Sequence, residues 1–186
     1  MTDPRGESAT LGLALEDRLP LSWTVCDTSN LGSLQLANQD TLRIILALEE
    51  HIPEAEERGA NAPELARIDF KLNLVLDLVS KLLERHLVLP APRLTRLTPE
   101  VVEWVADDGP SAGSNVEVQL FLCNRYPRAI VLPGRVTGTS TGADGLRTSV
   151  SFEGLGDTVK EELEKLIFRR HRRLVAQARR ASSADS

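Results

Sequence analysis

Two groups of arginines have the clearest potential for binding chemistry in this sequence. Arg93 and Arg96 lie three residues apart, and residues 168–173 read FRRHRR. A guanidinium group can donate paired hydrogen bonds to a phosphate or a carboxylate. The first pair could therefore hold phosphate, or both residues could be ordinary solvent-facing strand residues. The second group could bind phosphate, nucleic acid or an acidic partner, or it could be a solvated helix face whose cations suit the C-terminal end of the helix dipole.

Residues that commonly catalyse reactions or bind metals are scattered along the chain. His51, His86 and His171 lie far apart, and neither Cys26 nor Cys123 belongs to a CxxC pair. The sequence contains no GxSxG, no glycine-rich phosphate loop and no HExxH. We therefore expect neither an enzyme nor a metal or cofactor requirement.

Composition and charge narrow the class of protein. Among 186 residues, 41% are hydrophobic, which is enough for a core, but only 4% are aromatic and the net charge is −5. Few aromatics and an acidic balance argue against a nucleic-acid-binding surface. Two cysteines without disulfide spacing fit a reducing compartment, and no signal sequence or long apolar run is present. The expectation is a cytoplasmic protein without membrane insertion.

One segment has the spacing of a coiled-coil seam. Its apolar residues follow steps of 3-4-3-4-3: Leu65, Ile68, Leu72, Val75, Val79 and Leu82. Further apolar residues lie outside this seam: Phe70, Leu74, Leu76, Leu78 and Leu83. A helix with several apolar faces must be covered on several sides. Other copies of the chain could supply this cover in a homo-oligomer, in which the basic end could also meet the acidic first half of a neighbour, or the helix could pack in an intramolecular hairpin against the helix predicted before it.

The segments before this seam read as helix and connection. Residues 1–10 are expected to be frayed, and residues 11–23, which contain Pro20, read as a docking segment. A helix is predicted over 31–52, ending at Pro53. Asn61 could cap the next helix, which would run to about Leu87 and stop before Pro90. At 1.5 Å per residue this helix would be roughly 35 Å long.

After Pro92 the apolar period changes to two, which predicts strands. Alternation occurs over 116–122 and 146–152, β-forming residues fill 129–137, and residues 93–105 contribute one or two more strands. Turn residues separate these runs, and a helix returns over 155–181. The predicted fold class is α+β: N-terminal helices, five or six antiparallel strands in a small barrel, and a closing helix. On the closing helix, the residues expected to form the apolar face are Val159, Leu163, Leu166, Ile167 and Phe168.

This order of elements resembles the PilZ domain. The leading helices, the LPLSW segment (19–23), the VEW strand (102–104) and the FRRHRR tract look like its atypical branch, which forms tetramers through a long heptad helix. The resemblance covers about residues 19–180. It implies an N-terminal segment (1–30), a helical oligomerisation region (31–89), a PilZ-like barrel with its helix (90–181) and a flexible tail (182–186).

The resemblance also implies a role in bacterial cyclic di-GMP signalling, in control of motility, pili or exopolysaccharide. The family's ligand-binding members use an RxxxR pair and a [DN]xSxxG motif. Here the nearest arginines, Arg93 and Arg96, are one residue closer together, Arg96 takes the place of the Asp, Val101 that of the Gly, and Thr98 stands for the Ser. Two expectations follow: a cyclic di-GMP receptor that uses Arg93, Arg96 and Thr98, or an adaptor that acts only through a signalling or pilus-related protein.

Overall fold

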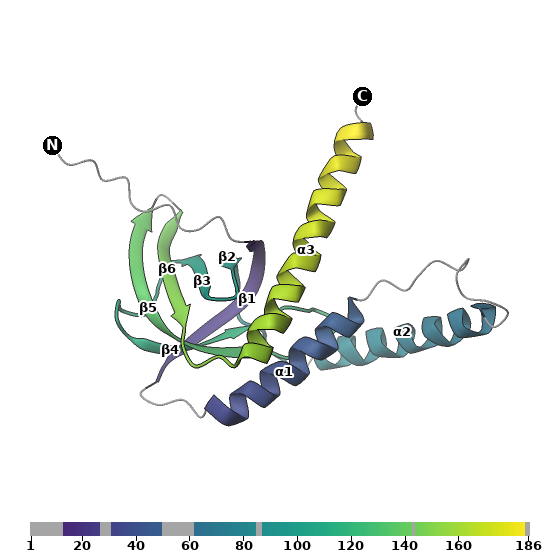
Figure 1. Ribbon diagram of the computed structural model, residues 1–186, viewed down its shortest axis with the longest axis horizontal. Coiled ribbons are helices and arrows are strands. Elements are labelled where there is room, and N and C mark those ends of the chain that lie inside the picture. Colours follow the sequence, from purple (N-terminus) through teal and green to yellow (C-terminus); the bar gives the residue numbers. More distant parts are fainter. Residues whose placement is uncertain (1–12, 27–30, 50–61, 85–86, 143, 185–186) are drawn as a thin grey trace.

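The residues that the structure describes fold as a six-stranded barrel with three helices. A computed structural model describes residues 13–26, 31–49, 62–84, 87–142 and 144–184. In chain order the elements are β1 (Leu15–Val25), α1 (Leu31–Leu48), α2 (Ala62–Glu84), β2 (Pro92–Leu97), β3 (Val101–Ala106), β4 (Asn115–Leu120), β5 (Ile130–Gly142), β6 (Gly145–Phe152) and α3 (Asp157–Ala184). The strands close in the order β1-β2-β3-β6-β5-β4 and every pair is antiparallel (Figure 1). The predicted α+β class is confirmed.

Alternation in the sequence determines which side of each strand is buried. In β4, Val116, Val118 and Leu120 are buried, whereas Glu117 and Gln119 between them are partly exposed. Gly134 in β5 is required by close packing, since a Cβ there would lie 2.4 Å from the Ser151 carbonyl oxygen. A larger residue would push β5 away from β6.

The prediction of a docking segment over 11–23 is wrong, because Leu15–Val25 is β1 and completes the barrel. This strand changes partner at Pro20. Residues up to Pro20 pair with β2, and residues from Leu21 onward pair with β4. The Pro20 carbonyl accepts a hydrogen bond from the Phe121 amide at 3.1 Å. Proline has no amide hydrogen to donate to the ladder, but its carbonyl and the residues on either side of it continue the pairing.

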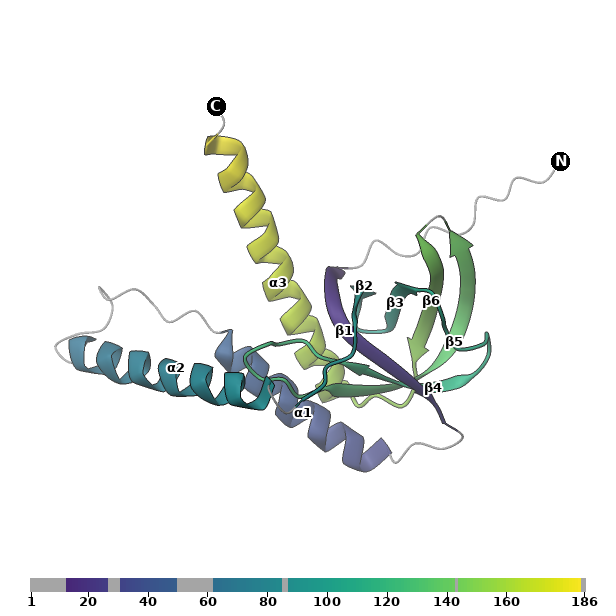
Figure 2. The same cartoon turned by 180° about the vertical axis from the view of Figure 1, so that it is seen from behind.

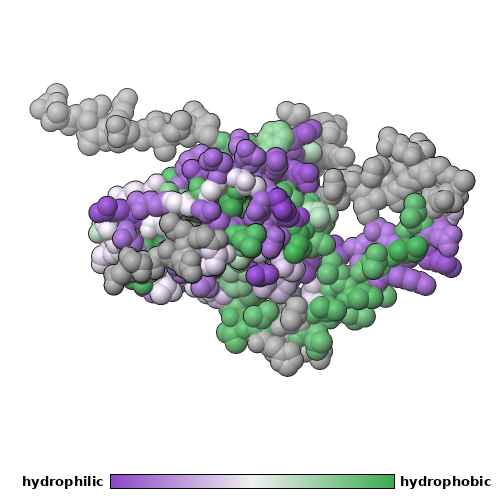
Figure 3. Space-filling view, turned by 60° about the horizontal axis from the view of Figure 1, so that its bottom comes forward, coloured by the Kyte–Doolittle hydropathy of each residue, from purple (hydrophilic) through white to green (hydrophobic). Residues whose placement is uncertain are grey.

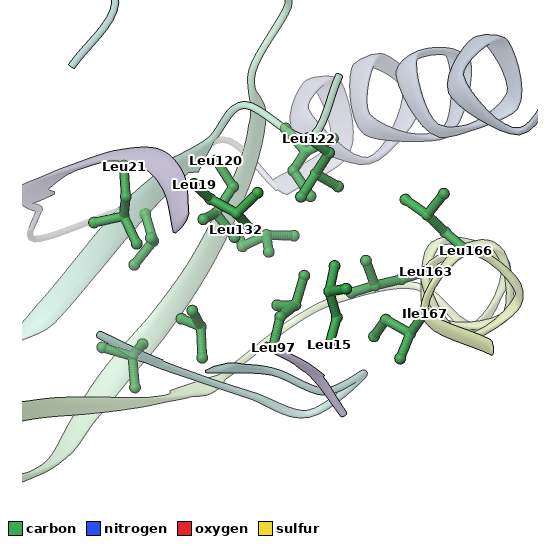
Figure 4. Close-up of a cluster of buried hydrophobic side chains, with 14 of the residues drawn as sticks. Leu15, Leu19, Leu21, Leu97, Leu120, Leu122, Leu132, Leu163, Leu166 and Ile167 are labelled. Carbon is green, nitrogen blue, oxygen red and sulfur yellow. The ribbon is translucent and has the colours of Figure 1, made fainter. Parts of the chain in front are cut away.

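The core extends from the barrel interior to α3. Figure 4 shows Leu15 and Leu97 facing Leu163 and Ile167 of α3. The closing helix is therefore part of the core, as predicted, except for Phe168, which is 48% exposed. Helix α1 packs on α3 and β5. Its Asn38 donates to the Val131 carbonyl at 2.7 Å and accepts from the Val131 amide at 2.8 Å, as a neighbouring strand would.

Helix α2 projects away from the barrel (Figures 1 and 2). Within the described residues, α1 and α2 do not pack along one another, so the hairpin alternative is wrong. Helix α3 reaches Ala184, and residues 182–184 of the expected flexible tail are therefore helical. The predicted cap Asn61, His51, His86 and residues 1–10 lie outside the described residues. Among the residues described, no helix has the length and apolar character needed to cross a membrane.

Candidate functional site

Arg93 lies on β2 beside a hollow of about 580 Å³. Its side chain is 21% exposed, and its Nη1 lies 3.3 Å from the Asp108 carboxylate. Arg18 contributes a second cation to this hollow, while Asp107, Asp108 and Asp144 contribute three carboxylates. The surroundings of Arg93 are therefore of mixed charge with an acidic excess.

Arg96 lies between two carboxylates on the outer side of the barrel. The register aligns it with Glu16 on β1 and Glu103 on β3. Its guanidinium nitrogens lie 3.5 Å from Glu16 Oε1 and 3.6 Å from Glu103 Oε2. Ser149 on β6 donates to Glu103 Oε1 at 3.0 Å, so a row of polar residues crosses four neighbouring strands.

The two arginines do not converge on one site. Residues three apart on a strand point to opposite sides. Arg96 accordingly lines a second, smaller hollow of about 170 Å³, which shares Leu94 and Val105 with the larger one. A ligand that used both guanidinium groups would have to span both hollows.

Thr98 uses its hydroxyl in the turn between β2 and β3. The oxygen accepts from the Val101 amide at 2.9 Å and from the Glu100 amide at 3.3 Å. The hydroxyl also donates to the Val101 carbonyl at 3.2 Å. These local bonds are typical of threonine at a turn and occupy the group that the resemblance assigned to a ligand.

The FRRHRR tract lies on α3, where three of its arginines contact α1. Arg169 donates to the Leu46 carbonyl at 3.1 Å. Arg170 donates to Glu49 Oε1 through Nε at 2.9 Å and Nη2 at 2.6 Å, and Arg173 lies 3.2 Å from Glu49 Oε2. Arg173 also donates to the Glu49 carbonyl, so the tract binds the C-terminal end of α1, where unpaired carbonyls attract cations.

This arrangement corrects the interpretation of the tract as a solvated helix face for the part around Arg170. Arg170 and Glu49 are only 14% and 13% exposed, so this part is not a solvated helix face. The acidic group that it meets belongs to the same chain. We call the contacts of Arg169, Arg170 and Arg173 with Leu46 and Glu49 the clamp between α3 and α1. Arg172 lies outside this clamp, with its guanidinium 5.6 Å from the centre of the Phe168 ring. His171, which directly precedes Arg172, is also exposed.

The six seam residues of α2 all lie at the surface. Their exposed fractions run from 47% for Val79 to 63% for Leu72. Phe70, Leu74 and Leu78 are also exposed, with Phe70 at 69%. Figure 3 shows hydrophobic side chains gathered on the helical side of the molecule. The seam and the second apolar stripe are therefore both open in a single chain.

Several residues of these sites could not be assigned from the sequence. Glu16, Glu103 and Asp108 become neighbours of the arginines only through strand pairing. Glu49 is one acidic residue among many in the first half of the chain. Its position at the end of the predicted helix, opposite a basic helix, was the available signal. Among the described residues, no group of three or more His, Cys, Asp or Glu side chains is arranged to hold a metal ion.

Comparison with known proteins gives a family model and a solved structure that each match over most of the chain. The family model described as an atypical PilZ domain, cyclic di-GMP receptor, matches residues 42–180. A crystal structure from Xanthomonas campestris, described as a tetrameric PilZ domain self-assembled via an unusual helical bundle, has a TM-score of 0.69 and 21% identity. The match covers 90% of this chain and 92% of that one, which shows a shared fold.

Two further structures match over smaller parts. An inhibitor of motility from Bacillus subtilis, MotI/DgrA, has a TM-score of 0.38 and 15% identity, over 43% of this chain and 41% of that one. YcgR from Escherichia coli in complex with cyclic di-GMP has a TM-score of 0.42 and 14% identity, over 48% and 39%. No curated protein matches the sequence. On its match over residues 42–180, the chain belongs to the atypical PilZ domain family, a family of cyclic di-GMP receptors with a regulatory role.

Proposed function

We propose that this chain is a non-catalytic PilZ-type regulatory module of bacterial cyclic di-GMP signalling that assembles, as a homotetramer, through α2. The observation that carries the proposal is the exposed surface of α2, where nine large apolar side chains are between 47% and 69% exposed. The similar Xanthomonas campestris protein is described as a tetramer built through a helical bundle. We extend that mode of assembly to this chain and expect it in the cytoplasm.

The arc of exposed residues indicates more than one neighbour for each α2. The seam residues lie on one side, and Phe70, Leu74 and Leu78, at spacings of four, lie on another. Fully burying a leucine or valine side chain contributes roughly 1.5–3 kcal/mol. Nine half-exposed side chains can therefore offset the roughly 4–15 kcal/mol that association costs.

Mass measurement tests the assembly. Light scattering should give about 82 kDa for the wild type, four times the 20.4 kDa of one chain. Val75→Asp with Val79→Asp places two charges in the seam and should give a smaller species. Val88→Asp is the matched control, because Val88 is 99% exposed and lies after α2. A wild-type mass of 20.4 kDa at all concentrations would contradict the proposal.

A specific observation bears on the ligand. Arg93 and Arg96 each have carboxylate neighbours, and they line different hollows. A cyclic dinucleotide with two phosphates would have to displace these carboxylates. The charges therefore favour the second form of the proposal, an adaptor that acts through protein contacts, over a receptor that uses Arg93, Arg96 and Thr98.

Calorimetry separates the two forms. We expect no saturable heat when cyclic di-GMP is titrated into the wild type. Saturable binding that Arg93→Ala or Arg96→Ala abolishes would establish the receptor form. Thr98→Ser keeps the hydroxyl and serves as the control. Assembly can be measured in the same samples, so loss of binding is not confused with loss of the oligomer.

A further inference from the structure

Helix α2 has a narrow polar stripe on the side that its apolar residues leave free. Asn73 and Ser80 are seven residues apart, which corresponds to two helical turns and about 10.5 Å along the axis. Leu76 lies between them on the same side and is half-buried. Ser80, at 5% exposed, is the most buried side chain of the described part of α2. This stripe is where α2 meets its own chain.

Both polar residues contact Arg125, in the connection between β4 and β5. Arg125 Nη2 donates to Asn73 Oδ1 at 2.8 Å. Ser80 Oγ lies 2.5 Å from the Arg125 carbonyl oxygen and 2.8 Å from the Leu76 carbonyl oxygen of its own helix, and its single hydroxyl hydrogen is shared between these two acceptors. One residue thus holds α2 at two points, and two points on a rod fix its direction whereas one point would act as a pivot.

The connection that carries Arg125 is itself held to the barrel and to α3. Leu122 is 4% exposed, and its carbonyl accepts a hydrogen bond from Arg170 of the clamp. The Tyr126 amide donates to the Cys123 carbonyl at 3.2 Å, and Pro127 is buried. The connection is therefore anchored by buried residues on both sides of Arg125, Leu122 before it and Pro127 after it.

We propose that Arg125 is a positioning residue that sets the direction of α2 relative to the barrel. The contact turns the polar stripe inward and the apolar arc outward. In the assembly, which rests on the proposed function, the angle set at Arg125 fixes how far apart and in which orientation the barrels are held. This assigns a role to a loop residue that contacts neither the seam nor the hollows beside Arg93 and Arg96.

Amide hydrogen exchange tests the contact directly. Removing a hydrogen bond made by a charged group should make exchange over residues 73–80 about tenfold faster in Arg125→Ala. Arg128→Ala is the matched control, because Arg128 is an exposed arginine in the same connection whose side chain makes no hydrogen bond or ion pair with the described residues. Asn73→Ala removes the same hydrogen bond and should also make exchange faster. Alanine is the better helix former and by itself would slow exchange, so faster exchange in this variant can be assigned to the lost bond.

The double variant, Arg125→Ala with Asn73→Ala, completes the test. If Arg125 acts through Asn73, the double variant should exchange no faster than either single variant. At unchanged mass, small-angle scattering should show a larger radius of gyration for Arg125→Ala. Exchange within about twofold of the wild type in Arg125→Ala would overturn the proposal. The exchange measurement reads the contact in a monomer or a tetramer, so failure of the assembly would be recognised separately by mass.

Discussion

The arginines of β2 have neighbours that oppose an anionic ligand. Asp108 lies beside Arg93, and Glu16 and Glu103 flank Arg96. Partly exposed ion pairs contribute roughly 0–1 kcal/mol each, so these carboxylates weaken anion binding without forbidding it. The charge on the neighbours should therefore affect how strongly these hollows bind a phosphate.

Neutralising the carboxylates beside Arg93 and Arg96 should therefore strengthen the binding of an anionic ligand. Glu103→Gln with Asp108→Asn keeps both shapes and removes two negative charges. Titration with cyclic di-GMP should then give measurable heat, which we do not expect for the wild type, because each carboxylate no longer competes for its guanidinium. Glu117→Gln, at an outward position of β4, changes one charge away from these arginines and is the control. Equal affinity in the neutralised variant and the wild type would show that the carboxylates do not compete with the ligand.

Thr98 should matter for stability. Thr98→Val keeps the shape of the side chain but removes an oxygen that accepts from two amides, so the free energy of unfolding should fall by about 1 kcal/mol. Thr98→Ser should restore most of it. Urea denaturation measures both. A stable Thr98→Val protein that has lost cyclic di-GMP binding would instead place the hydroxyl in a ligand site.

The arginines of the candidate site could be found from the sequence, but their environment could not. Residue type and spacing identify Arg93 and Arg96. Glu16 is about eighty residues earlier, and it becomes a neighbour because β1 pairs with β2 in one particular register. A shift of that register by one residue would turn Glu16 to the other side of the strand.

At the scale of elements, the clamp between α3 and α1 contains the least exposed ion pair among the described residues, Arg170 with Glu49. Arg170→Ala leaves the 13%-exposed Glu49 carboxylate with Arg173 alone. Because the substitution removes two hydrogen bonds to this carboxylate from a largely buried guanidinium, we expect the free energy of unfolding to fall by about 2 kcal/mol. Arg172→Ala, which removes an exposed guanidinium near Phe168, should cost far less. Chemical denaturation compares the two, and equal losses would contradict the clamp.

The clamp also bears on nucleic-acid binding by this helix. Arg169 already donates to Leu46 of α1, and Arg170 and Arg173 donate to Glu49, directly after that helix. Fewer cations remain to contact phosphates, so DNA or RNA should bind weakly and without a steep dependence on salt. Binding to duplex DNA measured at two salt concentrations checks this. Tight binding that decreases strongly with salt would show that the tract leaves α1 to reach a ligand.

Most elements were predictable because their signals are local. The heptad spacing, the alternating strands and the closing helix each occupy a continuous stretch of sequence. Strand β1 was missed because Pro20 argues against a strand, and because its partners β2 and β4 lie some seventy to one hundred residues later. Its role depends on closing the barrel, which is a property of the whole topology.

For the whole molecule, assembly and stability should be linked. If α2 is covered only in the oligomer, mass action stabilises the folded chain as concentration rises. A tenfold increase in concentration should then raise the Tm of the wild type by roughly 2–4 °C.

Val75→Asp with Val79→Asp should keep a folded barrel, because neither side chain belongs to the core, but its Tm should not depend on concentration. Near-ultraviolet circular dichroism, which reports on buried Trp104, follows the transition. Val88→Asp should show the wild-type shift, and a concentration-independent Tm in the wild type would mean that α2 is stable without neighbours.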